Sequence, residues 1–130
     1  MQASVSRMVA TLAAGTVLAS CATGNPELVR AGAPPGAIEV VNEAEHPITD
    51  LRIGICGDTF MGQPDYGHDR LEGRRIAPGQ SLSVPASAGC YNVSAMTSAG
   101  PVFGRTEEFF GVVYVGDEPG AVARWTIPLR

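Results

Sequence analysis

From residue 37 onward, apolar residues occur in short runs that turn-forming residues separate. In 51–56, Leu51, Ile53 and Ile55 recur at every second position, the period of a strand with one buried face. Expected strands lie in 37–42, 51–56, 76–85, 89–96, 107–116 and 121–129. No segment after residue 21 has the i, i+3, i+4, i+7 spacing of an amphipathic helix. The pattern predicts an all-β domain, a small antiparallel β-sandwich or barrel of about six to seven short strands.

One expected strand differs from the others in its composition. The run 107–116, EEFFGVVYVG, is the most apolar of the set, and both of its faces carry apolar residues. Strands that are buried on both sides read in this way, so we expect a central strand. Between the strands, 43–50, 98–104 and 117–120 are expected turns, and 57–75 is expected to be a long irregular loop.

The chain has three cysteines. Without Cys21, which belongs to the N-terminal motif described below, two remain, Cys56 and Cys90. In an oxidising compartment such a pair predicts a disulfide between Cys56 and Cys90. Closing a loop of about 35 residues would stabilise the fold by roughly 3–4 kcal/mol. Free thiols for metal or redox chemistry are the alternative, but redox pairs normally stand two residues apart.

The first 20 residues have the order of an export signal: a short segment ending in Arg7, an apolar stretch, then small residues. Leu18-Ala19-Ser20-Cys21 resembles the lipobox of bacterial lipoproteins at all four positions. The resemblance implies cleavage before Cys21 and acylation of that residue, with chains such as palmitate. By resemblance to the sorting of Gram-negative lipoproteins, Ala22 in place of Asp favours the outer membrane, and we expect the domain to face the periplasm. An ordinary secretory signal with a chance cysteine is the alternative.

The sequence therefore divides into three parts. Residues 1–20 are the expected lipoprotein signal peptide, and residues 21–36 are the expected lipidated cysteine and flexible tether. The tether is rich in proline and glycine and has no apolar period. Residues 37–130 are the expected β-sandwich domain.

Charge narrows the choice of partner. The formal net charge is −4, and the sequence contains no lysine. Nucleic-acid binding requires clustered basic residues, so we expect no nucleic-acid partner. Attachment to anionic lipid by charge alone is also disfavoured. The expected membrane contact is the covalent lipid on Cys21.

Several short motifs follow one another along the domain. They are Cys56-Gly57, Ile76 to Ser81, Gly89-Cys90-Tyr91-Asn92-Val93, Gly111-Val112 and Trp125-Thr126. Over residues 38–127 the chain resembles small secreted or lipid-anchored bacterial β-domains of unknown function, with a PGxS turn before a CYDV-like strand. Asn92 stands where that pattern has Asp. The resemblance implies a β fold and supplies no activity.

The loop 57–75 contains the candidate functional residues. Phe60, Met61 and Tyr66 are apolar side chains in a segment that should be exposed. They either fold back onto the sheet as a lid or form a contact patch for a partner.

Catalytic and metal chemistry find little support in the sequence. Asp65, His68 and Asp69, with His46, could bind a metal, but they lack the spacings of zinc or EF-hand calcium sites. A solvated loop is the preferred interpretation, so no metal or cofactor is expected. The GxSxG motif of a serine nucleophile is absent.

We therefore expect a membrane-anchored envelope lipoprotein whose domain is not an enzyme and binds an envelope protein or glycan. One alternative is an inhibitor of an envelope-attacking hydrolase, a lysozyme or a protease. A less favoured alternative is a metal-dependent enzyme that uses His46, Asp65, His68 and Asp69.

Overall fold

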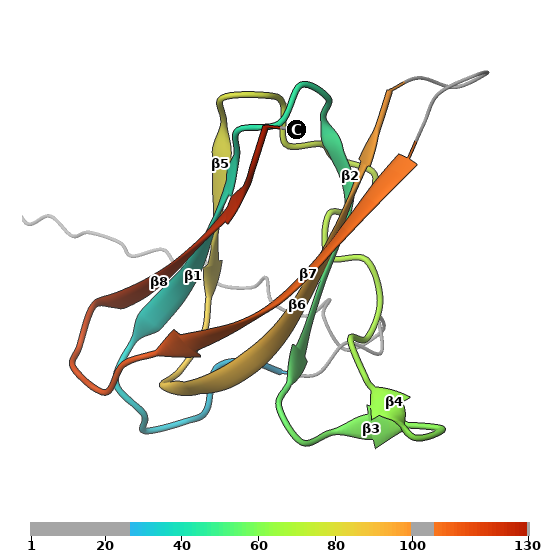
Figure 1. Cartoon of the computed structure of the whole chain (residues 1–130). Coiled ribbons are helices and arrows are strands. Elements are labelled where there is room, and N and C mark those ends of the chain that lie inside the picture. Colours follow the sequence, from blue (N-terminus) through green and yellow to red (C-terminus); the bar gives the residue numbers. More distant parts are fainter. Residues whose placement is uncertain (1–26, 100–105, 130) are drawn as a thin grey trace, which may run out of the picture.

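The computed structural model describes residues 27–99 and 106–129. These residues form eight strands and no helix (Figure 1). The strands are β1 (Gly36–Asn42), β2 (Ile48–Ile55), β3 (Thr59–Phe60), β4 (Gln63–Pro64), β5 (Ser81–Pro85), β6 (Gly89–Ser98), β7 (Thr106–Val115) and β8 (Ala121–Ile127). The predicted all-β class is confirmed. The expected export signal and Cys21 lie outside the described residues, as does most of the expected turn at 98–104.

Two three-stranded sheets, β5-β1-β8 and β2-β6-β7, pack against each other in a sandwich-like arrangement, and β3-β4 is a separate hairpin (Figure 1). All strand pairs are antiparallel except β1 and β8, which are parallel from Gly36 opposite Ala121 to Asn42 opposite Ile127. The expected purely antiparallel order is therefore wrong for this pair. Parallel neighbours need a long crossover, which the whole chain between β1 and β8 provides. Within the described residues the sheets do not close into a barrel.

Most expected strands are present, with shifted ends. β2 begins at Ile48 rather than residue 51, inside the segment expected to be a turn. Ile48 pairs with Thr97, and the register shifts between Ile48 and Asp50, which indicates a β-bulge. The bulge interrupts the two-residue alternation, and for this reason the sequence pattern did not predict the first residues of this strand.

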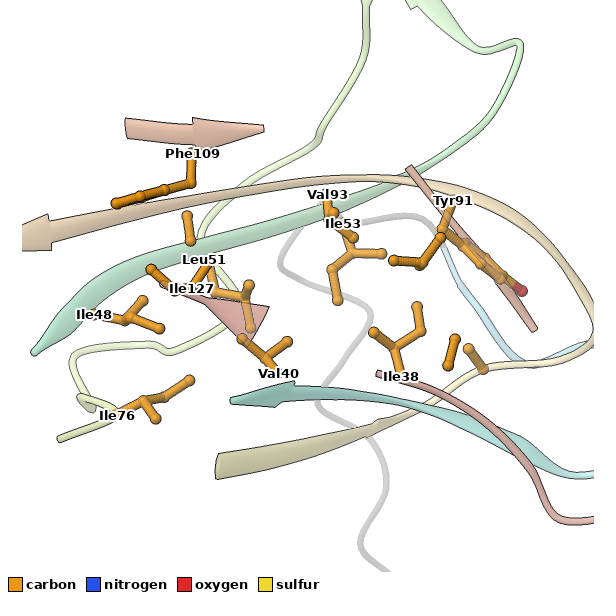
Figure 2. Packing of buried hydrophobic residues seen from close by; sticks show 14 of the residues in the cluster. Ile38, Val40, Ile48, Leu51, Ile53, Ile76, Tyr91, Val93, Phe109 and Ile127 are labelled. Atoms are coloured by element: carbon orange, nitrogen blue, oxygen red, sulfur yellow. The ribbon is translucent and has the colours of Figure 1, made fainter. Parts of the chain in front are cut away.

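The core lies between the two sheets and is built by alternate residues of the long strands (Figure 2). β6 shows this most clearly, since Tyr91, Val93 and Ala95 are buried and the residues between them are only partly buried. The other fully buried large side chains include Ile38, Val40, Ile48, Leu51, Ile53, Leu71 and Ile127. Burial of each such side chain contributes about 1.5–3 kcal/mol to folding.

The segment before β1 is part of the folded domain. Leu28 is buried, and its carbonyl accepts a hydrogen bond of 2.9 Å from the Ser87 amide. The Tyr91 hydroxyl lies 2.6 Å from the Ser87 carbonyl and 3.2 Å from that of Leu28. The Arg30 amide donates to the Ser87 hydroxyl at 2.8 Å. Part of the segment expected to be a tether, at Leu28 and Arg30, therefore packs on the domain.

Candidate functional site

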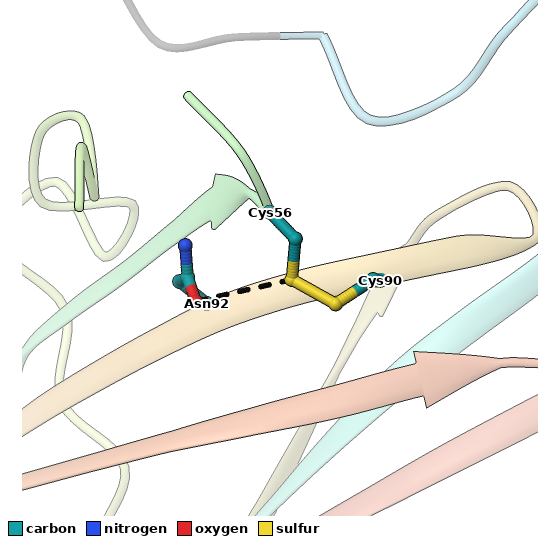
Figure 3. Close-up of a disulfide and its surroundings, with 3 residues drawn as sticks. All are labelled: Cys56, Cys90 and Asn92. Atoms are coloured by element: carbon teal, nitrogen blue, oxygen red, sulfur yellow. Dashed lines mark hydrogen bonds between the residues drawn. A yellow bond between two sulfur atoms is a disulfide. The ribbon is translucent and has the colours of Figure 1, made fainter. Parts of the chain in front are cut away.

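The disulfide lies on the outer face of the β2-β6-β7 sheet, where it fixes the start of the 57–75 loop (Figure 3). Cys56 directly follows β2 and Cys90 lies on β6, with their Cα atoms 5.4 Å apart. The Cys56 amide donates to the Cys90 carbonyl at 3.1 Å, and Asn92 Oδ1 lies 3.8 Å from the Cys56 sulfur. The predicted Cys56–Cys90 disulfide is confirmed.

The first part of the loop forms the β3-β4 hairpin instead of irregular chain. Phe60 ends β3, and Met61 and Gly62 form the two-residue turn, with φ of 53° and 81°. Positive φ at both turn residues is the pattern of a type I′ turn, which favours Asn, Asp or Gly at its first position. Phe60 is 66% exposed and Met61 is 86% exposed. These two predicted contact residues therefore do not fold back onto the sheet.

Tyr66, the third predicted contact residue, does fold back. Its ring lies against that of Phe110 on β7, with centroids 5.7 Å apart and planes tilted by 54°. The backbone at Asp65 and Tyr66 crosses β2 at Gly54, where an added Cβ would lie only 1.9 Å from the Asp65 carbonyl oxygen. Gly54 thus permits the loop to lie on the sheet. We call residues 65–67 the strap.

Beyond the strap, the loop covers the free edge of β2. The Leu51 amide donates to Asp69 Oδ1 at 3.0 Å, and the Arg70 amide donates to the Leu51 carbonyl at 2.7 Å. Arg70 Nη2 donates to the Ile53 carbonyl at 3.0 Å, and burial lowers the pKa of this guanidinium. Leu71 is buried in the core. An edge strand covered in this way is protected from pairing with another chain.

Of the four residues considered for a metal site, Asp65 and Asp69 use a carboxylate oxygen to accept backbone amides. Asp65 Oδ1 accepts the Gly67 amide at 2.9 Å, and Asp69 Oδ1 accepts the amides of Leu51 and Leu71. His46 lies in the connection before β2, and its carbonyl accepts a hydrogen bond from Asn42 at 2.9 Å. In the described part of the chain, no three His, Cys, Asp or Glu residues are grouped so that they could hold a metal ion.

β7 is the last strand of its sheet, and the expected central position is wrong. Its inner residues Phe109, Val113 and Val115 are buried. On its outer face Phe110, Val112 and Tyr114 are 59%, 51% and 73% exposed. The sequence showed two apolar faces correctly, but one of them is turned toward solvent, which marks it as a candidate interaction surface.

A groove opens between β7 and β8. The two strands leave the turn at 116–120 together and then diverge (Figure 1). The Trp125 indole fills the space beside Gly111, where an added Cβ would lie 2.9 Å from Nε1. Farther from the turn the strands enclose a groove of about 400 Å³. Its lining is Glu108, Phe109, Phe110, Trp125, Thr126, Ile127 and Pro128. No feature of the sequence pattern alone brought these two segments together.

No protein-family model, curated protein or solved structure matches the chain. The resemblance to bacterial lipoproteins and to small secreted β-domains stays a prediction. Among the described residues, no helix is both long and apolar enough to cross a membrane. Three exposed features of the described residues are candidates for function: the hairpin tip at Phe60 and Met61, the outer face of β7, and the β7–β8 groove.

Proposed function

We propose that this protein is a cell-envelope lipoprotein whose non-catalytic β-domain binds a protein partner through the tip of the β3-β4 hairpin. Cys21 carries the lipid, and the domain faces the periplasm from the outer membrane. The observation that carries the proposal is the exposure of Phe60 and Met61 at the end of a hairpin that projects from the domain (Figure 1).

The conformation of Met61 supports a contact role. A non-glycine residue at positive φ costs free energy, and Met61 occupies a position where Asn or Gly would fit with less strain. Strained residues of this kind concentrate at functional sites. A long apolar side chain that is 86% exposed contributes little to folding, so binding is the better reason for its presence.

The hairpin is held in place at its base. The Cys56–Cys90 disulfide precedes it, and the Asp65 amide donates to the Asp58 carbonyl at 3.0 Å across its two ends. The strap then packs Tyr66 against Phe110. A contact surface that is ordered before binding loses less conformational entropy on association.

Charge defines the partner further. Residues 57–67 contain Asp58 and Asp65 and no Arg, Lys or His, and both aspartates are exposed. An apolar tip on an acidic base is complementary to an apolar pocket with a basic rim. We therefore infer a partner protein that presents such a pocket.

Anchoring restricts where this partner lies. Leu28 belongs to the folded domain and is only seven positions from Cys21. Seven residues span at most about 25 Å when fully extended. A lipid on Cys21 would thus keep the domain close to the membrane surface, where we expect the partner. Mass spectrometry of the membrane fraction tests this anchor: an acylated N-terminal Cys21 supports it, and an unmodified chain still carrying residues 1–20 contradicts it.

In-cell crosslinking followed by affinity capture tests the hairpin. We compare the native chain with Phe60→Ser and Met61→Asn, and with Val122→Ser as a matched control on the other sheet, where Val122 is 59% exposed. Both hairpin variants should lose one abundant partner, and the control should keep it. Met61→Asn should leave the melting temperature unchanged or higher, because Asn tolerates positive φ.

Equal capture by all variants would contradict the hairpin as the contact. Binding of an envelope glycan in place of a protein, lost in the same two variants, would keep the module and change the class of partner.

An inhibitor of an envelope-attacking hydrolase is a second candidate. A hairpin with an exposed Phe at the end of β3 and an exposed Met in its two-residue turn is narrow enough to enter an enzyme cleft, as a loop-insertion inhibitor does. The purified domain would then inhibit a lysozyme or a protease, and Met61→Asn would weaken the inhibition. No inhibition of either class at micromolar protein would remove this candidate.

A further inference from the structure

The β7–β8 groove has the chemistry of a site for a cation. Trp125 and Phe110 are the aromatic residues with exposed or partly exposed side chains in its lining, and Glu108 is its charged residue. Among the described residues that line it, none is Arg, Lys or His. A carboxylate and an indole that line the same groove can both attract a cation, the first by its charge and the second by the negative face of its ring.

On the β8 side, the neighbouring basic residue does not form an ion pair with Glu108. Arg124, next to Trp125 in the chain, is directed to the outer face of the other sheet, where its Nε donates to Glu39 Oε1 at 2.6 Å. Glu108 itself is exposed on the outer face of β7. The groove therefore has negative charge that a positively charged ligand would complement.

We propose that this groove binds an arginine side chain of an extended segment of a protein partner. A guanidinium is planar, stacks on aromatic rings and forms paired hydrogen bonds with a carboxylate, which suits Trp125 and Glu108 better than the compact ammonium of lysine. β7 and β8 are each the last strand of their sheets, so an extended chain can lie along the opening between them. The groove volume of about 400 Å³ holds one such side chain and its neighbours.

Trp125 is the only tryptophan in the chain, so its fluorescence reports on the groove directly. The full-length chain is titrated with a five-residue peptide of alternating valine and arginine, and with the same peptide carrying neutral citrulline. The arginine peptide should shift the Trp125 emission saturably, and the citrulline peptide should bind about tenfold more weakly. Glu108→Gln should weaken arginine-peptide binding about tenfold, whereas Glu118→Gln, the same change in the exposed turn at 116–120, should have no effect.

The proposal would be overturned by equal binding of the two peptides, by equal effects of the two glutamine substitutions, or by the lack of a saturable shift at millimolar peptide. An emission shift with a neutral glycan such as chitotriose, and none with the arginine peptide, would likewise assign the groove to another ligand. The groove is separate from the hairpin tip, and Phe60→Ser should leave peptide binding unchanged. Failure here and failure of the hairpin contact are thus distinguishable.

Discussion

Replacing Asn42 should strongly destabilise this domain. Asn42 ends β1 and is fully buried. Its Nδ2 donates to the carbonyls of His46 and Ile76, each at 2.9 Å, and its Oδ1 accepts the Ala44 amide at 2.9 Å. One side chain therefore fixes the connection to β2 and the segment that precedes β5. We expect Asn42→Ala to release both.

The size of the effect follows from the groups left behind. Asn42→Ala removes three hydrogen bonds and leaves two carbonyls and one amide without that partner. Each loss costs about 1–3 kcal/mol, and the Ile76 bond is the one that is buried throughout. With about 1 kcal/mol for each of the two partly buried bonds and about 1–3 kcal/mol for the buried one, the sum is about 3–5 kcal/mol. The total stability of a domain of this size is about 5–15 kcal/mol. The melting temperature should fall by at least about 12 °C.

Urea unfolding followed by circular dichroism, with the disulfide intact, measures this loss at an unchanged m-value. Asn92→Ala is the matched control, because Asn92 is partly exposed on the outer face of β6, and it should cost less than about 1 kcal/mol. Asn42→Asp should also destabilise the domain at pH 7. Burial raises the pKa of a carboxyl group, so this variant should regain stability as the pH falls. A loss below 1 kcal/mol for Asn42→Ala would refute the reasoning.

Two further substitutions test the attachment of the 57–75 loop. Replacing Cys56 and Cys90 together by Ser should lower the free energy of unfolding by about 3.8 kcal/mol on the chain-entropy relation for a loop of about 35 residues, measured by urea unfolding. A loss under 1 kcal/mol would mean that the loop is held by other contacts. Gly54→Ala should displace the strap, cost about 1–3 kcal/mol, and speed hydrogen exchange of the Gly67 amide. Unchanged exchange would show that the strap does not depend on Gly54.

Local pattern predicted most of the strands, because each has its own period and its own turn signals. The run 89–96 became β6, with Tyr91, Val93 and Ala95 inward as the alternation required. The disulfide also followed from the sequence, since only two cysteines remain after Cys21. These features depend on neighbours along the chain, and so a sequence can specify them.

The loop 57–75 shows what the local sequence pattern does not predict, namely which of its side chains pack on the sheet. The sequence identified Phe60, Met61 and Tyr66 together as apolar residues of one loop. The structure separates them: the two at the hairpin tip are exposed, while Tyr66 packs on Phe110, 44 positions later in the chain. That separation depends on Gly54, whose missing side chain admits the strap, and the sequence pattern gave no sign of it.

The sequence by itself determined the all-β class, the strand runs, the disulfide partners and the apolar character of both faces of 107–116. The tertiary structure alone decided that β7 lies at an edge, that β1 and β8 run parallel, and that Trp125 meets Gly111 beside a groove. The physical reason is that strand formation follows from alternation within a few residues. Strand order depends on which other strands each apolar face packs against, and this packing involves residues far apart in the chain.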